Sequence, residues 1–250
     1  PNTLKSALVP FFADIPLRAG YVGESRFGLL NILHRLKQRD LPLMAERYAQ
    51  LAEKPGEPVS RPLAAPRLSV DLANLLITVG RLGLHRGKQI VAFCPGAEFG
   101  PAKRWPAVHF AQLARQLAAR GSDVWIIGSG SEAAIGESIA AGSGGAAVNL
   151  CGKTDLASAI DLMSAADLVV TNDSGLMHVA AALAKPTVAL YGSSSPEHTP
   201  PLSASARVVR IEGLACSPCY QRECPLGHFR CMNELTPERV MEQIGILAAG

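Results

Sequence analysis

Continuously apolar segments of strand length alternate with amphipathic segments along most of this chain, and this alternation limits the folds that it can adopt. From residue 90 onward six such segments occur, and helical spacing of apolar residues marks four of the stretches between them. Strands that are apolar on both faces and separated by helices are typical of a parallel sheet covered on both sides. The expected strands are 90–94, 123–127, 146–150, 167–171, 187–191 and 207–211, and the expected helices are 107–120, 132–141, 156–165 and 176–184.

The chain ahead of this region is organised differently. Helices are expected at 4–12 and 43–54, with a strand at 18–22 between them. Four prolines follow within the segment Pro55–Pro66, a composition typical of a semi-rigid linker. We therefore expect an N-terminal α/β domain with its linker at 1–68, a parallel-sheet domain at 69–235 and a C-terminal helix at 236–250.

The composition excludes several classes of protein. Apolar residues make up 48% of the chain and charged residues 18%, which excludes a disordered polyelectrolyte. No apolar run reaches the ~18–20 residues of a membrane helix, and six cysteines in 250 residues are too few for a disulfide-built scaffold. The net charge of +3 does not suggest a nucleic-acid partner.

The ends and the charge distribution give weaker indications. The chain opens without a secretion signal, so we expect a cytoplasmic protein. Residues 1–90 hold 13 basic and 7 acidic side chains. This excess suits an anionic partner or a membrane surface, and a set of solvated helix faces explains it equally well.

The loop after strand 90–94 carries residues that suit a phosphate ligand. In open parallel sheets, ligands bind at the carboxyl ends of the strands, where the strand order reverses. Gly96 and Gly100 allow the backbone to approach a ligand closely, and Lys103 and Arg104 can neutralise phosphate. The alternative is an ordinary surface loop with two solvated cations.

The segment Asn172–His178 follows strand 167–171 and favours an anion site. Asp173 or Ser174 is expected to cap the next helix, and Gly175 leaves its first amides uncovered. Such a helix start binds anions through its N–H groups and the positive end of its dipole. A capped helix with a packed histidine explains the same residues. Together with the polar loop 192–201, these loops point to a nucleotide diphosphate.

Two further motifs point elsewhere. The segment Gly128–Ala133 fits the looser form of the dinucleotide fingerprint, so a nicotinamide-dependent oxidoreductase is an alternative function. Asn149 and Cys151, however, stand where that class needs an acidic residue. Gly152-Lys153-Thr154 resembles the end of a phosphate loop, but Ala147 replaces the required glycine, so we reject this interpretation.

Four cysteines, Cys216, Cys219, Cys224 and Cys231, follow the last expected strand. Four thiolates within sixteen residues could close a tetrahedral zinc site. The second spacing is shorter than in zinc ribbons, so we rank reduced, packed thiols ahead of zinc. We place disulfides last, because thiols stay reduced in the cytoplasm.

Three segments together resemble the ADP-heptose:lipopolysaccharide heptosyltransferase II group of glycosyltransferase family 9. They are Pro95–Pro106, Asn172–His178 and Tyr191–Pro196, and the cysteine tail and Pro1–Phe12 are similar to that group as well. The resemblance covers essentially the whole chain. It implies a GT-B fold, in which two Rossmann-like domains face each other across a cleft and the second domain holds most of the donor.

The same resemblance implies a reaction. The expected activity is inverting transfer of L-glycero-D-manno-heptose from ADP-heptose to the heptose/Kdo inner core of lipopolysaccharide. It implies no required cofactor, a place at the inner face of the cytoplasmic membrane, and peripheral contact with that membrane. By motif, Lys103 contacts the diphosphate or heptose, Asp173 holds heptose hydroxyls, Ser174, Gly175 and His178 surround the diphosphate, Glu132 lies near the nucleoside, and Thr154 lies beside the adenine.

The catalytic base is left unassigned. In this family it is taken to be an Asp in a Gly-Asp loop after the first strand, and residues 1–54 contain no such segment; Asp14 and Asp40 stand outside any such motif. We therefore expect the base to lie upstream of Pro1 and the N-terminal domain to be incomplete. A folded but inactive ADP-sugar-binding remnant is accordingly a third interpretation.

Overall fold

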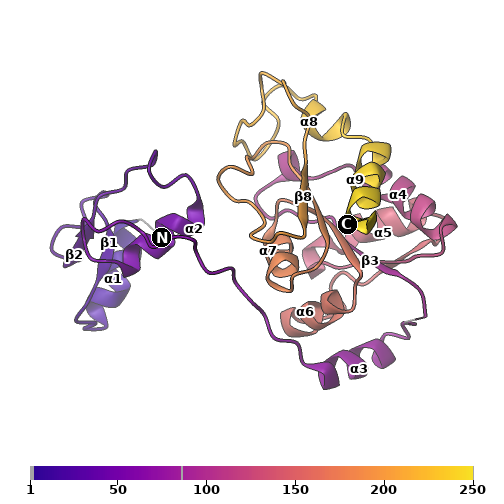
Figure 1. Ribbon diagram of the computed structural model, residues 1–250, viewed down its shortest axis with the longest axis horizontal. Coiled ribbons are helices and arrows are strands. Elements are labelled where there is room, and N and C mark those ends of the chain that lie inside the picture. Colours follow the sequence, from indigo (N-terminus) through magenta and orange to yellow (C-terminus); the bar gives the residue numbers. More distant parts are fainter. Residues whose placement is uncertain (1–2, 86, 250) are drawn as a thin grey trace. The chain divides into compact units, whose positions relative to one another are not determined.

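The computed structural model describes residues 3–85 and 87–249, and within them the chain divides into two compact units (Figure 1). The first unit is Pro1–Ala64 with Glu197–Pro200, and the second is Ala65–Pro196 with Pro201–Gly250. The division falls inside the segment that we expected to end at residue 68. The expected C-terminal helix belongs to the second unit. Pro1, Asn2 and Gly250, which our expectations included, lie outside the described residues.

The first unit combines short helices with a small parallel sheet. Thr3 caps α1 (Leu4–Phe12) by accepting from the Ser6 N–H at 3.2 Å. The strands β1 (Ala19–Tyr21) and β2 (Ile32–His34) pair in parallel. The helix expected at 43–54 is shorter, because α2 (Met44–Ala49) tightens into the 3-10 turn η1 (Gln50–Ala52).

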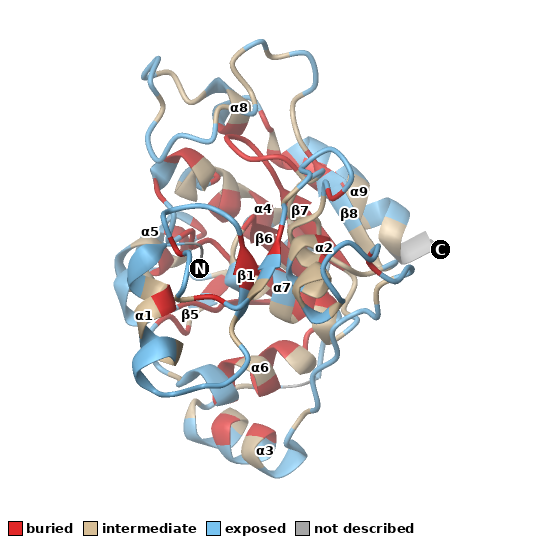
Figure 2. Cartoon of the chain, turned by 90° about the vertical axis from the view of Figure 1, so that its left-hand side faces the viewer, coloured by how far each residue is buried: buried red, intermediate tan, exposed pale blue. Residues whose placement is uncertain are grey.

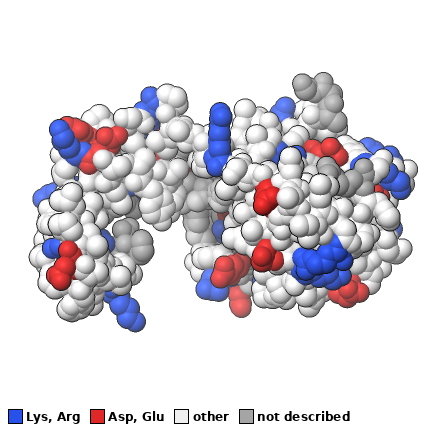
Figure 3. Space-filling view, turned by 90° about the horizontal axis from the view of Figure 1, so that it is seen from below, with Lys and Arg blue, Asp and Glu red and all other residues white. Residues whose placement is uncertain are grey.

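Several large apolar side chains of the first unit are exposed. Val9, Phe12, Leu17 and Phe27 each expose more than half of their surface. Figure 3 shows Lys and Arg side chains at several places on this unit, with acidic side chains among them. The first unit therefore presents both apolar and charged groups to its surroundings.

Six strands of the described chain form the sheet of the second unit, and every pairing is parallel. Their order is β5-β4-β3-β6-β7-β8, so the chain builds outward from β3 in one direction and then from β6 in the other. The expected parallel α/β sheet is therefore confirmed. The strands are β3 (Ile90–Cys94), β4 (Asp123–Ile126), β5 (Ala147–Asn149), β6 (Leu168–Asn172), β7 (Thr187–Leu190) and β8 (Ala206–Val209).

Helices cover both faces of this sheet (Figure 1). Alternate residues of β3 divide between two cores, because successive side chains of a strand point to opposite faces. Val91 and Phe93 belong to one core with α4, α5 and α9, whereas Ile90 and Ala92 belong to the other with α3, α6 and α7. Figure 2 shows buried residues concentrated along the strands. The helices are α3 (Leu72–Arg81), α4 (Ala107–Ala119), α5 (Ala133–Gly142), α6 (Leu156–Ser164), α7 (Gly175–Ala182), α8 (Arg230–Asn233) and α9 (Pro237–Ala249).

Local sequence signals explain the ends of some helices, but they did not lead us to expect α3. Gly121 ends α4 with φ of +87° and donates to the Ala118 carbonyl at 2.9 Å, which confirms the expected glycine at this end. We did not expect α3, although Asp71 caps it by accepting from the Ala73 N–H at 2.9 Å. Within the described chain, no helix combines the length and the apolar character that crossing a membrane requires.

Candidate functional site

The loops that follow β3 and β6 meet at the point where the strand order of the sheet reverses. Lys103 ends the 3-10 turn η2 (Pro101–Lys103) after β3, and Asp173 follows β6 directly. The Lys103 Nζ lies 2.5 Å from the Asp173 Oδ2, with side chains 18% and 6% exposed. Sequence reasoning expected this cation at the carboxyl edge of the sheet, and the structure places it there.

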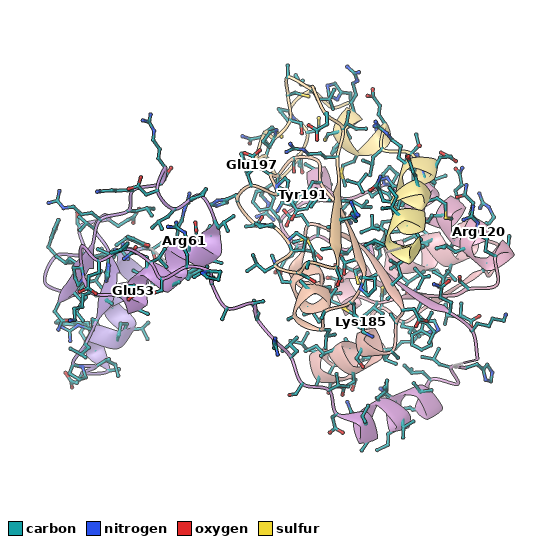
Figure 4. All side chains as sticks on the ribbon, viewed as in Figure 1. Glu53, Arg61, Arg120, Lys185, Tyr191 and Glu197 are labelled. Atoms are coloured by element: carbon teal, nitrogen blue, oxygen red, sulfur yellow. The ribbon has the colours of Figure 1, made fainter. Side chains whose placement is uncertain are left out.

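A third loop reaches the same carboxylate. The hydroxyl of Ser194, which follows β7, donates to the Asp173 Oδ2 at 2.6 Å. Tyr191, labelled in Figure 4, lies at the start of that loop, and burial followed by the Asp173 charge raises its pKa. Loops from three neighbouring strands therefore converge on Asp173. Ser194 lies in the polar loop that carries part of the family resemblance, but sequence reasoning assigned this residue no role of its own.

Asn172 fixes the geometry of this convergence, and sequence reasoning assigned it no role. Its side chain is fully buried, and its Nδ2 donates to the Pro95 carbonyl at 2.7 Å. Its Oδ1 accepts from the Trp105 N–H at 3.1 Å. The side-chain amide of Asn172 thus hydrogen-bonds to both ends of the loop that carries Lys103. The available signal was an asparagine that ends a buried strand beginning with Leu168, Val169 and Val170.

The start of α7 has the backbone geometry of a capped helix without a side-chain cap. Ser174 occupies the N-cap position with extended backbone, and Gly175 is exposed. Ser174, one of the two residues expected to cap this helix, is thus its N-cap residue, but in the described chain its side chain does not hydrogen-bond the first amides of α7. Asp173 is instead engaged by Lys103. Amides at such a helix start are suited to bind an anion.

His178 lies one turn into α7 within electrostatic range of the same pair. Burial of its ring lowers the imidazole pKa, although part of the side chain is exposed. Asp173 acts in the opposite direction, and Lys103 adds to the lowering. A neutral imidazole is therefore favoured near pH 7, where it can donate one hydrogen bond.

Beside this cluster, the carboxyl ends of the strands border a cavity of 760 Å³. Four of the predicted site residues line it, namely Glu132, Thr154, Ser174 and Gly175, whereas Lys103, Asp173 and His178 are outside its lining. The cavity walls also include charged, small and apolar side chains. These are Gly96, Glu98, Arg104, Ile127, Gly128, Ser129, Gly130, Ser131, Asp155, Leu156, Ala159, Leu176 and Val179.

Glu132 is held rigidly on one wall of this cavity. Its Oε2 accepts from the Ser129 N–H at 2.6 Å and from the Ser129 hydroxyl at 3.0 Å. The carboxylate also fills the space beside Gly96, where any Cβ atom would overlap it. A fixed carboxylate of this kind can accept hydrogen bonds from ligand hydroxyls.

The cysteines do not form a metal site in the described chain. Each of the six is a free thiol, and no group of three or more described His, Cys, Asp or Glu side chains is placed to hold a metal ion. A zinc site at Cys216, Cys219, Cys224 and Cys231 is therefore not supported. Cys94 and Cys151 are buried as expected, and burial raises the pKa of Cys151 to about 12.

Comparison with protein families gives a match over nearly the whole chain. Residues 1–230 match the model of glycosyltransferase family 9, described as heptosyltransferase. The chain belongs to glycosyltransferase family 9. This family is one of enzymes, so the chain is a glycosyltransferase and the resemblance of its motifs is confirmed.

Individual relatives are similar over almost the full length of this chain. It is 44% identical to lipopolysaccharide heptosyltransferase 2 of Escherichia coli K12, covering 99% of this chain and 73% of that protein. It is 42% identical to lipooligosaccharide heptosyltransferase 2 of Haemophilus influenzae, covering 100% of this chain and 75% of that protein.

Solved structures confirm the GT-B type of α/β fold. The structure of E. coli ADP-heptose lipopolysaccharide heptosyltransferase II matches with a TM-score of 0.88 at 44% identity, covering 99% of this chain and 74% of that one. A family 9 glycosyltransferase from Veillonella parvula, 21% identical, shares the fold with a TM-score of 0.81, covering 99% of this chain and 71% of that one.

The nicotinamide alternative is not supported in this family member. The Asn149 Oδ1 accepts from the Cys151 N–H at 3.1 Å, and its Nδ2 donates to the Ala133 carbonyl at 3.2 Å. This amide is occupied in bracing the loop after β5. It leaves no carboxylate at the position from which dinucleotide-binding sheets bind a ribose hydroxyl.

Proposed function

We propose that this chain transfers L-glycero-D-manno-heptose from ADP-heptose to the heptose/Kdo inner core of lipopolysaccharide, with inversion at the anomeric carbon. The observation that carries the proposal is the meeting of Lys103, Asp173 and an uncapped helix start where the strand order reverses. The 44% identity to a protein named lipopolysaccharide heptosyltransferase 2 supports this choice of sugar and acceptor.

The donor would lie along the carboxyl edge of the sheet. Its adenosine would occupy the 760 Å³ cavity, with Glu132 accepting from ribose hydroxyls and Thr154 beside the adenine. Its diphosphate would reach the amides at Ser174 and Gly175. Asp173 would then accept from heptose hydroxyls, because it lies beyond the cavity next to Lys103.

The same groups can lower the barrier to transfer. As the glycosidic bond breaks, negative charge grows on the departing ADP, and fixed positive groups stabilise it. Lys103 supplies a fixed ammonium beside the start of α7, and the α7 amides and the neutral His178 ring can donate to that charge. This scheme uses the chain's own groups and requires no cofactor.

Attack by the acceptor requires a base, and we assign it to no described residue. The acceptor hydroxyl attacks the anomeric carbon from the face opposite ADP while a base removes its proton. The residues discussed above supply only the donor side. We place the N-terminal unit on the acceptor side of the reaction, as the family resemblance implies.

We place the reaction at the inner face of the cytoplasmic membrane, with peripheral contact between protein and lipid. The basic excess of residues 1–90 and the exposed Val9, Phe12, Leu17 and Phe27 support this contact. Flotation with anionic phosphatidylglycerol vesicles tests it. Binding that weakens with added salt is expected, and equal binding to neutral vesicles would contradict the electrostatic part.

A transfer assay tests the proposed function directly. The chain is incubated with ADP-heptose and with lipopolysaccharide that carries a single inner-core heptose. Mass spectrometry then measures the mass of the acceptor. The gain of one heptose is expected if the protein tested supplies the base, which we assign to no described residue. Lys103→Ala should slow transfer by about 100-fold or more, since removing one group that stabilises transition-state charge typically costs this much.

Lys88→Ala is the matched control, because Lys88 lies ahead of β3 at the opposite edge of the sheet and is 61% exposed. It should leave the rate unchanged. ADP binding without any transfer would support the inactive-remnant interpretation instead, and equal transfer from UDP-sugars would contradict the choice of donor.

A further inference from the structure

The cysteine segment, residues 216–231, packs against the loop that carries Lys103. The Ala102 N–H donates to the Arg222 carbonyl at 3.1 Å, and Ala102 immediately precedes Lys103. The Arg222 backbone also lies so close to Gly100 that a side chain at that glycine would overlap it. A shift of the cysteine segment would therefore displace Lys103.

The same segment contacts the loop after β7. The Tyr220 N–H donates to the Ser193 carbonyl at 2.7 Å. Ser193 immediately precedes Ser194, whose hydroxyl donates to Asp173. The cysteine segment is thus hydrogen-bonded to both of the loops whose side chains converge on Asp173.

A cavity of 260 Å³ is lined by this segment and by the two loops that it contacts. All four thiols of the segment are free and only partly buried, unlike those of Cys94 and Cys151. The cavity therefore brings accessible thiols next to the donor site. Its lining includes Cys216, Cys219, Cys224, Cys231, Ala102 and Ser193.

Cys224 has the surroundings of a reactive thiol. Its Sγ accepts from the Phe229 N–H at 3.4 Å, and the His228 Nδ1 lies 4.0 Å away. Hydrogen bonds from this turn, that of Phe229 first, lower the Cys224 pKa, whereas burial raises that of Cys231. Thiolates rather than thiols are the nucleophiles, so Cys224 is expected to react first.

We propose that the cysteine cavity is an oxidation site, at which a peroxide converts Cys224 and a second cavity thiol into a disulfide and thereby disturbs the contacts of Asp173. The Cys224 thiolate attacks a peroxide oxygen, the O–O bond breaks, and a sulfenic acid and hydroxide form. The second thiol then attacks the Cys224 sulfur, the S–S bond forms, and water leaves. Two thiols are oxidised and one peroxide is reduced to water.

We expect the closing of this bond to move the cavity wall. A disulfide brings two sulfur atoms to ~2.05 Å, and the two Cα atoms to within about 7 Å. Because the segment is bonded to Ala102 and Ser193, we expect that movement to reach Lys103 and Ser194. The consequence for the donor rests on the proposed function, whereas the thiol chemistry does not.

The test uses the full chain, reduced and then treated with hydrogen peroxide. Differential alkylation with peptide mass mapping follows each cysteine, and calorimetry follows ADP. Cys224 should lose alkylation first, with a disulfide formed among the four thiols. The Kd for ADP should rise at least about threefold and return after dithiothreitol. Cys224→Ser should keep its affinity under peroxide, and the control Cys94→Ala should respond like the wild type.

Three results would overturn the inference. In the first, the remaining cavity cysteines of Cys224→Ser are oxidised as fully as those of the wild type. In the second, the oxidised chain binds ADP with unchanged affinity. In the third, the purified protein contains a metal that shields the four thiols. Failure of the proposed function looks different. In that case the reduced chain does not bind ADP at all, while the thiol mapping is unaffected.

Discussion

Lys103 and Asp173 form an ion pair in the part of the site that we assign to the anionic end of the donor. Their 2.5 Å contact is mostly buried, so the charges are weakly screened by solvent. A diphosphate arriving at the α7 amides would attract Lys103 and be repelled by Asp173. The carboxylate therefore opposes binding of the nucleotide, while we expect it to orient the sugar.

Asp173→Asn separates these two effects. The change removes the repulsion and frees Lys103, so ADP should bind as tightly as before or up to about tenfold more tightly. Heptose transfer should fall at least about tenfold, because the amide is a poorer acceptor for sugar hydroxyls. Calorimetry and the transfer assay measure the two quantities separately. A parallel loss of both would show that Asp173 serves mainly to hold Lys103 in place.

His178 should make ADP binding depend on pH. Burial lowers its pKa below the ordinary value of about 6.5, so the ring is neutral at pH 7 and gains a proton only in more acidic solution. A protonated ring attracts the diphosphate more strongly. The ratio of wild-type to His178→Gln affinity for ADP should therefore rise from about pH 7.5 to about pH 5.5. Since both proteins bind the same ADP, a flat ratio would exclude His178 from the anion site.

At the scale of elements, a buried amide joins β6 to the loop after β3. Asn172→Ala leaves the Pro95 carbonyl and the Trp105 N–H without their partner in a fully buried place. The free energy of unfolding should fall by about 2–6 kcal/mol, since each of the two unsatisfied buried groups costs about 1–3 kcal/mol. Urea denaturation measures this change. An unchanged free energy of unfolding would contradict a structural role for this amide.

The sheet could be predicted because strands that are buried on both faces contain runs of consecutive apolar residues. β3 reads Ile90 to Cys94 without a polar residue, and all five side chains are buried. The helix α3 and the strand β2 could not be predicted in the same way. Leu72, Leu76 and Ile77 of α3 are exposed, so its apolar residues do not mark a single buried face. β2 is only three residues long and ends in a histidine.

At the scale of the whole molecule, every residue that we assign to the donor belongs to the second unit. The chain passes between the units in the proline-rich segment near Ala65 and again at both ends of Glu197–Pro200. Residues 65–250 produced alone should therefore bind ADP with an affinity within about twofold of that of the full chain. Calorimetry with both proteins tests this. A folded second unit that fails to bind ADP would show that the first unit completes the site.

The candidate site could be predicted in part from the same sequence. Lys103 and Asp173 were each expected at the carboxyl edge, and parallel strands bring their loops to that edge. Ser194 and Asn172 could not be singled out, because their roles depend on contacts between loops 21 and 77 residues apart in the chain. The catalytic roles of the predicted residues stay predictions until they are measured.

The central claim is that Lys103 and the start of α7 hold the diphosphate of the donor. Calorimetric titration of the wild type and of Lys103→Ala with ADP and with adenosine tests it most directly, because adenosine lacks the diphosphate. Lys103→Ala should weaken ADP binding by about tenfold or more, equivalent to about 1.4 kcal/mol, and leave adenosine binding unchanged. Equal weakening of both ligands, or of neither, would contradict the claim.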